Sequence, residues 1–275
     1  MHLTQYITGI LARFEMSECR VKRNPESSRD DPITAPDETM LNRKDILLYQ
    51  EMTGTLLFCV TMCRPDLAHS VGMLARRMSK PRVRDHVAAC RVFRYLQGTK
   101  DLGILFKYKE DSKHPGLVAY ADSDWGADTE GRRSTSGYVV MFNGAPVSWQ
   151  SSMQSIVALS TCEAEYIAAS DAAREVYYMR EVASFIRNPQ PGPTVLYEDN
   201  QGAVQLVENP VHHKRTKHID VKYHYIRAAQ ENGVIKVEKI HTDLNHADIM
   251  TKAATTVTFR RHVDALMQPM VQSVV

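Results

Sequence analysis

Several features that mark secreted, zinc-binding or membrane proteins are missing from this sequence. Its five cysteines are an odd number without zinc-type spacing, so we expect reduced thiols. The first residues lack the basic start and long apolar centre of a signal peptide. No run reaches the roughly 18 apolar residues that a membrane span needs. These absences predict a soluble, intracellular protein with no membrane partner.

The net charge is small, but the charged residues are unevenly distributed. The net charge is +2, yet the first 113 residues hold 19 basic and 14 acidic residues, and the remainder holds 15 and 18. Residues 76–100 carry eight Lys and Arg against a single acid, Asp85. This excess predicts contact with nucleic-acid phosphates, with Arg91 and Arg94 among the contacts. An ordinary solvated helix surface is the alternative.

Hydrophobic periodicity predicts a helical first part and an α/β second part. Residues 1–19 hold a short helix, residues 20–44 form a polar linker containing prolines, and residues 45–113 form two or three helices and a short strand from Gly103. The helices should break at Pro65 and Pro81. Residues 114–253 should form one α/β domain, and residues 254–275 show no clear pattern.

The second part predicts a mixed five-stranded sheet with helices on its faces. Three strands come first, with Asn143 and Gly144 as a hairpin turn between the second and third. The expected elements are strands at 117–121, 137–142 and 146–149, a long helix at 160–187, a strand at 193–197, helices at 200–207 and 219–231, a strand at 234–240 and a helix at 247–253.

Two pairs of acids lie at the ends of predicted elements. Asp122 and Asp124 share one face of the first strand, and the alternation of side chains does not choose between them. Glu163 fits a capping box in which its carboxylate binds the Ser160 N–H. Glu165 lies about 200° further around the helix, so capping does not explain it.

Two further acids lie near the end of the chain. Asp199 follows a strand at the edge where open sheets bind ligands, and Glu198 is expected to point the other way. Asp248 begins the last helix, where simple capping is the alternative. The set thus comprises one acid on the first strand, one on the long helix, one after the fourth strand and one on the last helix. Four converging carboxylates repel one another, so they predict bound Mg²⁺ or Mn²⁺.

Several phrases, in order, give the chain a family resemblance. They include Tyr120-Ala-Asp-Ser-Asp-Trp-Gly126, Thr161-Cys-Glu-Ala-Glu-Tyr166, Glu198-Asp-Asn-Gln201, His213-Lys-Arg-Thr-Lys-His-Ile-Asp220 and Ala247-Asp-Ile-Met-Thr-Lys252. With them the chain resembles the C-terminal part of the polyprotein of copia-type LTR retrotransposons. Residues 45–113 resemble the connection segment before ribonuclease H, and residues 1–19 resemble a remnant of the polymerase tail.

The resemblance implies a ribonuclease H-like α/β fold that cuts the RNA strand of RNA–DNA hybrids with two Mg²⁺ ions, Mn²⁺ being an alternative. It matches the catalytic carboxylates to Asp122, Glu165, Asp199 and Asp248, and so selects Asp122 over Asp124. The expected substrate contacts are Asn200, Gln201, His213, Arg215, Lys217 and His218, a solvated basic turn being the alternative for the last four.

The resemblance also sets expectations for partners and location. The aspartate pair of a polymerase palm is absent, so we expect no DNA synthesis from this chain. The expected partners are an RNA–DNA hybrid and the rest of a retrotransposon polyprotein. The expected location is cytoplasmic, in a virus-like particle, or nuclear. A catalytically inactive relic that binds nucleic acid is the rival function, and the order of the phrases disfavours an integrase- or resolvase-type nuclease.

Overall fold

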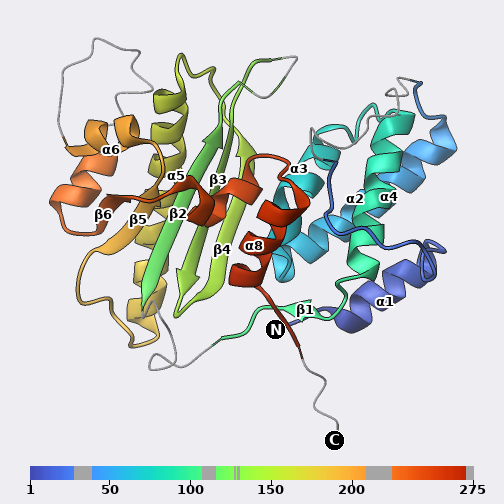
Figure 1. The fold of residues 1–275 in the computed structure, drawn as a ribbon, viewed down its shortest axis with the longest axis horizontal. Coiled ribbons are helices and arrows are strands. Elements are labelled where there is room, and N and C mark those ends of the chain that lie inside the picture. Colours follow the sequence, from blue (N-terminus) through green and yellow to red (C-terminus); the bar gives the residue numbers. More distant parts are fainter. Residues whose placement is uncertain (28–38, 107–115, 127, 129–130, 209–224, 271–275) are drawn as a thin grey trace, which may run out of the picture. The chain divides into compact units, whose positions relative to one another are not determined.

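The computed structural model describes residues 1–27, 39–106, 116–126, 128, 131–208 and 225–270, and the chain divides into two compact units (Figure 1). The helical unit comprises Met1–Leu105 and Ala253–Val275, and the sheet unit comprises Phe106–Lys252. The chain thus passes from the helical unit to the sheet unit and back. The boundary expected after residue 113 lies outside the described residues, so the domain limits stay predictions.

Helices make up most of the helical unit. They are α1 (Thr4–Arg13), α2 (Arg43–Met62), η1 (Pro65–Leu67), α3 (Ala68–Arg76), α4 (Val83–Gln97) and α8 (Thr256–Leu266). The helical pattern expected over residues 45–97, broken at Pro65 and Pro81, is confirmed. The strand expected from Gly103 is shorter than predicted, because β1 (Leu102–Gly103) has only two residues and pairs antiparallel with β7 (Gln268–Pro269).

Helix α8 lies in the segment that was expected to lack regular structure. Thr255 caps it by accepting a hydrogen bond from the backbone N–H of Thr258 at 3.3 Å. Phe259 and Val263 are buried on one side, and the Phe259 ring lies 5.6 Å from the ring of Tyr95. The expectation is wrong for residues 256–266, because Phe259, Val263 and Leu266 lie at the i, i+4, i+7 spacing of an amphipathic helix and this pattern was missed.

Part of the predicted linker packs against α4. Asn24 and Pro25 are buried. The Arg91 guanidinium donates hydrogen bonds to Asn24 Oδ1 at 2.6 Å and to Ser27 Oγ at 2.9 Å. Residues 22–27 are therefore a fixed part of the helical unit, while residues 28–38 lie outside the described part of the chain.

A buried ion pair stands at the centre of the helical unit. Arg64 donates to both carboxylate oxygens of Asp66, at 2.9 and 2.7 Å, and both side chains are fully buried. Burial alone would lower the pKa of Arg64, but the adjacent Asp66 carboxylate raises that pKa above its ordinary value. Tyr95 donates to Asp66 at 2.7 Å, and Thr99 accepts from Arg64 through its carbonyl and hydroxyl oxygens. The pair thereby joins η1 to the end of α4.

The sheet unit holds five strands in the order β4-β3-β2-β5-β6. Its elements are β2 (Leu117–Asp124), β3 (Thr135–Phe142), β4 (Ala145–Met153), α5 (Thr161–Phe185), β5 (Thr194–Glu198), α6 (Gln201–Glu208), helical residues 225–231, β6 (Ile235–Lys239), η3 (Thr242–Leu244) and η4 (His246–Met250). The first three strands run antiparallel, and β5 and β6 run parallel to β2.

This strand order and these directions confirm the predicted ribonuclease H-like mixed sheet. Asn143 and Gly144 both have positive φ, 49° and 80°, as a two-residue hairpin turn requires. None of the described helices has the length and hydrophobicity that crossing a lipid bilayer requires.

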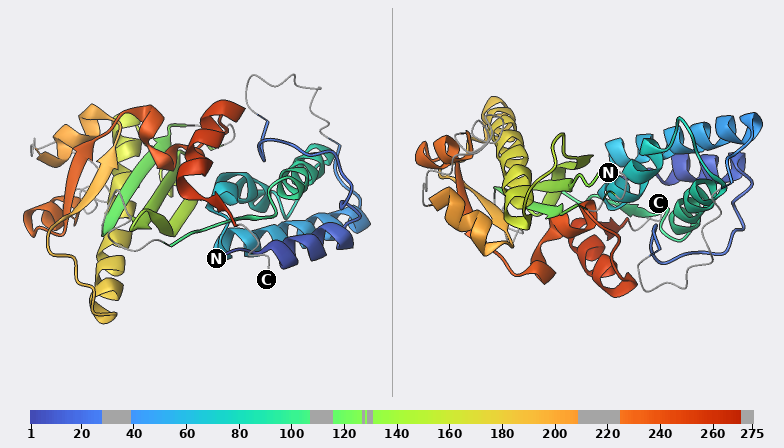
Figure 2. Two further views of the ribbon diagram at one scale, coloured as in Figure 1. Left: turned by 60° about the horizontal axis from the view of Figure 1, so that its bottom comes forward. Right: turned by 90° about the horizontal axis from the view of Figure 1, so that it is seen from above.

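The two faces of the sheet carry different elements (Figure 2). On one face, Ala119 and Ala121 of β2 pack in a core with Tyr166 and Val176 of α5. On the other face, η4 packs on β2 and β3. Gly137 allows this approach, because a Cβ there would lie only 2.6 Å from the Cβ of Met250. The end of β2 is therefore covered from both faces.

We expect Asp66→Ala to destabilise the protein strongly, because it leaves the Arg64 guanidinium buried without its carboxylate. Removing one partner of a buried pair costs about 3–5 kcal/mol. Urea denaturation would measure the loss. Asp101→Ala removes the same group from an exposed position of the same unit and should change the free energy of unfolding by less than about 0.5 kcal/mol. Equal effects of the two variants would contradict the structural role of the pair.

Candidate metal centre

Three carboxylates converge where β2 and β5 end. Asp122, Glu165 and Asp199 each offer an oxygen that lies within 4.8 Å of the other two. Asp122 and Glu165 are buried, with 2% and 7% of their surface exposed, and Asp199 is partly exposed. The structure thus brings together three of the four acids that the resemblance selected.

The register of the parallel strands explains why two of these acids meet. Tyr120 of β2 lies opposite Tyr197 of β5, and their rings are 5.3 Å apart. Two residues further along each strand, the chain reaches Asp122 and Asp199. Glu165 joins them from the beginning of α5, which packs on β2.

Burial and mutual repulsion govern the charge of this cluster. Burial raises the pKa of Asp122 to about 6, against the opposing effect of Lys252 and with a further contribution from Asp248. Burial also raises the pKa of Glu165 well above its ordinary value, and the charges of Glu198, Asp122 and Asp199 raise it further. A cation bound between these carboxylates would offset both the cost of burying their charges and their mutual repulsion.

Glu198 lies on the other face of β5 from Asp199, but it is close enough to the other acids to belong to this acidic group electrostatically. Its side chain is fully buried. Burial raises the pKa of Glu198 well above its ordinary value, and Asp122 and Asp199 raise it further. Alternation along β5 places Glu198 on the face that α5 covers, and the beginning of α5 carries Glu165 to the same place. Strand alternation alone does not show that the helix brings an acid there.

Glu163 has the structural role that its capping pattern predicts, displaced by one residue. Ser160 Oγ accepts a hydrogen bond from the Glu163 N–H at 3.2 Å. The Glu163 carboxylate reaches back to the N–H of Leu159, at 2.8 Å, rather than to that of Ser160. Glu163 therefore caps α5 and is not one of the three clustered carboxylates.

Asp248 lies beside the three carboxylates rather than among them. The Lys252 ammonium lies 2.5 Å from Asp248 Oδ1 and 4.0 Å from Asp122 Oδ2, so it stands next to both acids. The helix expected over residues 247–253 is shorter, since η4 is a 3₁₀ helix of the five residues His246–Met250. The i, i+4 spacing brings Lys252 to Asp248, and this ion pair was missed although both residues lie in the phrase ending at Lys252.

Two hydrogen-bonding side chains fix η4 against β2. Asn245 donates to the carbonyl oxygen of Ala121 at 2.7 Å and accepts from the N–H of Ala247 at 3.2 Å. The Thr251 hydroxyl donates to the Asp122 carboxylate. Asn245 and Thr251 are fully buried, so they hold Asp122 and η4 in one arrangement. Neither residue was identified from the sequence.

The donor set suits a hard divalent cation. All the converging groups are carboxylates, which are the ligands that Mg²⁺ and Mn²⁺ prefer. Glu165 Oε2 and Glu198 Oε2 are buried without a hydrogen-bond partner among the described residues. Such orphaned oxygens are rare in folded proteins and often mark an absent ion or water. The residues present therefore fit a metal centre.

Of the two predicted substrate contacts next to the cluster, Asn200 is held by hydrogen bonds within the protein and Gln201 is exposed to solvent. The Asn200 N–H donates to Glu198 Oε1, and Asn200 Oδ1 accepts from the N–H of Ala203, both at 3.1 Å. Asn200 therefore holds Glu198 and caps α6. Gln201 is exposed at the first position of α6, where it can meet a ligand.

The remaining predicted contacts lie elsewhere. His213, Arg215, Lys217 and His218 fall outside the described residues. Arg91 and Arg94 belong to α4 of the helical unit, where Arg91 binds Asn24 and Ser27. All six roles stay predictions.

The chain matches no family model, but known proteins resemble most of its length. It is 35% identical over 254 residues to the retrovirus-related Pol polyprotein from transposon TNT 1-94 of Nicotiana tabacum. It is 34% identical over 262 residues to the Pol polyprotein from transposon RE2 of Arabidopsis thaliana. The chain is a homologue of retrovirus-related Pol polyproteins. The alignments cover 90% and 94% of this Pol homologue and 18% of each relative, so the chain spans less than a fifth of their length.

Among solved structures, LC11-RNase H1, isolated from compost, is similar to half of this Pol homologue. The alignment covers 50% of this chain and 94% of that one, with 15% sequence identity and a TM-score of 0.39. The assignment of the fold rests on the strand order and directions given above.

The stability of the metal-free protein should depend on the protonation of Asp122. Its pKa is about 6 in the folded chain against an ordinary 3.8, so the folded state holds this proton more tightly than the unfolded state. The free energy of unfolding should therefore fall as the pH rises from about 4 to 6, by about 3 kcal/mol from this group.

Denaturation of the wild type and of Asp122→Asn, in chelator and across this pH range, would isolate the effect. The difference in stability between the two should change between pH about 4 and 6 and level off above. Asp124→Asn is the matched control on the same strand and should follow the wild type. A constant difference between wild type and Asp122→Asn would contradict the raised pKa.

Proposed function

We propose that this Pol homologue is a metal-dependent endonuclease of the ribonuclease H type, which hydrolyses the RNA strand of RNA–DNA hybrids. The observation that carries the proposal is the convergence of Asp122, Glu165 and Asp199, from three separate elements, within 4.8 Å. Their burial beside oxygens that lack hydrogen bonds is costly for a protein that binds nothing there. In a metal-dependent nuclease, bound cations would compensate these buried carboxylates.

The proposed ligands are Asp122, Glu165 and Asp199, with Asp248 as the fourth carboxylate. Two divalent ions bound here would activate a water molecule and stabilise the leaving oxygen of a phosphodiester. Thr251 fixes the orientation of the Asp122 carboxylate. Lys252 supplies positive charge beside Asp122 and Asp248, which favours the approach of an anionic backbone.

The proposed substrate follows from the homology to Pol polyproteins and from the chemistry of RNA. The 2′-hydroxyl is the group that distinguishes an RNA strand from DNA at a cutting site. We propose Asn200 and Gln201 beside Asp199, and His213, Arg215, Lys217 and His218 further along, as the contacts to the hybrid. The remaining parts of a Pol polyprotein are a proposed second partner, and a cytoplasmic or nuclear location stays a prediction.

A silent module that binds hybrid without cutting it is the rival proposal. The observation in its favour is Lys252, whose ammonium pairs with Asp248 and lies 4.0 Å from Asp122. In a silent module Lys252 would be sufficient to compensate the acidic charge, and divalent ions would bind weakly. The two proposals therefore differ in their dependence on divalent cations.

We expect Asp199→Asn to abolish hybrid cleavage while preserving the fold. Loss of even an outer partner of a metal ligand costs about 10–100-fold, so loss of a ligand should reduce cleavage by at least about 100-fold. The melting temperature should stay equal or rise, because one like charge leaves the cluster. The assay uses a labelled RNA–DNA hybrid with Mg²⁺, with Mn²⁺ and with chelator.

Asp124→Asn is the matched control, since it removes an acid from the same region outside the cluster. It should cleave like the wild type. Hybrid binding in Ca²⁺ should persist in both variants, because backbone contacts carry it. A wild-type protein that binds hybrid but cuts it with neither Mg²⁺ nor Mn²⁺ would favour the silent module.

A further inference from the structure

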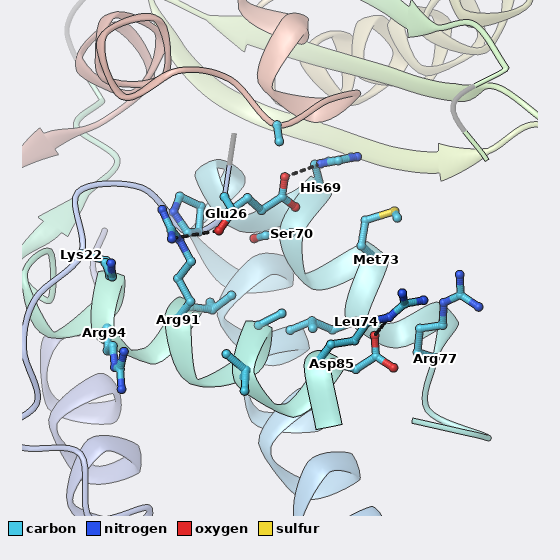
Figure 3. Close-up of a pocket in the computed structure, with 17 residues that line it drawn as sticks. Lys22, Glu26, His69, Ser70, Met73, Leu74, Arg77, Asp85, Arg91 and Arg94 are labelled. Atoms are coloured by element: carbon cyan, nitrogen blue, oxygen red, sulfur yellow. Dashed lines mark hydrogen bonds and ion pairs between the residues drawn. The ribbon is translucent and has the colours of Figure 1, made fainter. Parts of the chain in front are cut away.

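A cleft with a volume of about 710 Å³ opens in the helical unit (Figure 3). It is bordered by α3, by α4 and by residues 22–27. Its lining includes the apolar side chains of Met73, Leu74 and Val92. The cleft therefore offers both a concave shape and apolar contact surface.

Positive charge dominates the rim of this cleft. Five basic side chains line it, and only two carboxylates accompany them. The basic residues are Lys22, Arg77, Arg84, Arg91 and Arg94. Glu26 binds the His69 ring at 2.9 Å, and Asp85 accepts the Arg82 N–H at 2.8 Å as the cap of α4. Asp85 also lies 3.9 Å from the Arg84 guanidinium and offsets part of its charge. With five basic side chains against two carboxylates, the excess charge of the cleft is positive.

Arg91 holds one wall of the cleft in place. The hydrogen bonds of Arg91 to Asn24 and Ser27 hold residues 22–27 along α4, as does the backbone bond from Lys22 N to the Arg94 carbonyl at 3.2 Å. These bonds give Arg91 a positioning function, and its predicted contact with nucleic acid stays a prediction. Arg94 is exposed and lies at the cleft itself.

We infer that this cleft binds a single strand of nucleic acid through its phosphates. Figure 3 shows Lys22 and Arg94 towards one end of the cleft and Arg77 towards the other. Arg84 and Arg94 are separated by about 15 Å along α4, at 1.5 Å per residue. Cations spread over such a length suit successive phosphates of a chain better than one phosphate ion.

The size of the cleft selects a single strand over a duplex. Its volume lies in the range of about 300–1,000 Å³ that encloses one small ligand. A duplex, whose major groove alone is about 12 Å wide, is too large to enter. Positively charged grooves that follow the backbone are the usual sites for single strands. The inference relies on the proposed function only for choosing nucleic acid among polyanions.

The test measures binding of labelled oligothymidine, about 16 nucleotides long, to the full chain in chelator between about 50 and 200 mM salt. The cleft variant combines Arg77→Gln with Arg94→Gln, at opposite ends of the cleft. Each lost phosphate contact on a single strand should reduce the salt slope by about 0.7, so the double variant should reduce it by about 1.4.

The matched control combines Lys80→Gln with Lys100→Gln. These exposed lysines come from the same basic stretch, but neither lines the cleft. The control should keep the wild-type slope. Equal slopes for all three proteins, or equal reductions in both variants, would overturn the inference.

Two competitors test the identity of the ligand. A duplex of equal length, or a polyglutamate peptide of equal charge, should displace the labelled strand poorly, and equal competition by either would overturn the assignment. Asp199→Asn should bind oligothymidine like the wild type, because the cleft does not contain the carboxylates. A chain that fails to cut hybrid but shows cleft-dependent binding refutes the proposed function alone, and the opposite result refutes the cleft alone.

Discussion

The cost of holding negative charge out of water governs the sheet unit. Asp122, Glu165 and Glu198 are almost completely buried, and Asp122 is close enough to both glutamates to raise the pKa of each. Such a group persists only if protons, an internal cation or a bound metal ion compensates it. Lys252 is the internal cation, and burial raises the pKa of Asp122, which favours its protonation at low pH. Cation binding is the third means, and it is the one that leaves all the carboxylates ionised.

The elements that could be predicted are those in which local pattern and tertiary packing agree. The strand carrying Asp122 and the helix carrying Glu165 have clear periods, and Asp199 follows directly after a strand, so these elements were placed correctly. The choice of Asp122 over Asp124 came only from the resemblance. The fourth predicted acid, Asp248, was harder to place, because η4 is a short 3₁₀ helix held by Asn245 and its ion pair to Lys252 depends on that local geometry. Alternation along β5 turns Glu198 away from Asp199 but says nothing about which helix covers it, so its closeness to Glu165 was not foreseen.

The two units handle buried charge in opposite ways. In the helical unit Arg64 has its counterion two residues away and a further partner, Thr99, just after α4, so its charge is satisfied within the protein. In the sheet unit the acids come from β2, α5 and β5 and outnumber the nearby lysine. Complete internal pairing is typical of a structural centre, whereas an unbalanced cluster invites a ligand. This contrast distinguishes the stabilising charges from the functional ones without reference to any relative.

The return of the chain to the helical unit has a consequence for its synthesis. Residues of α8 and β7 complete that unit, and Phe259 packs against Tyr95 from a position more than 160 residues later. All strands of the sheet unit leave the ribosome before α8 does, and domains tend to fold as they emerge. The helical unit therefore begins to be synthesised before the sheet unit but completes its folding after it. Until then, the site for Phe259 stays open on the nascent chain, and a ribosome that stops after the sheet unit releases a protein whose older half is incomplete.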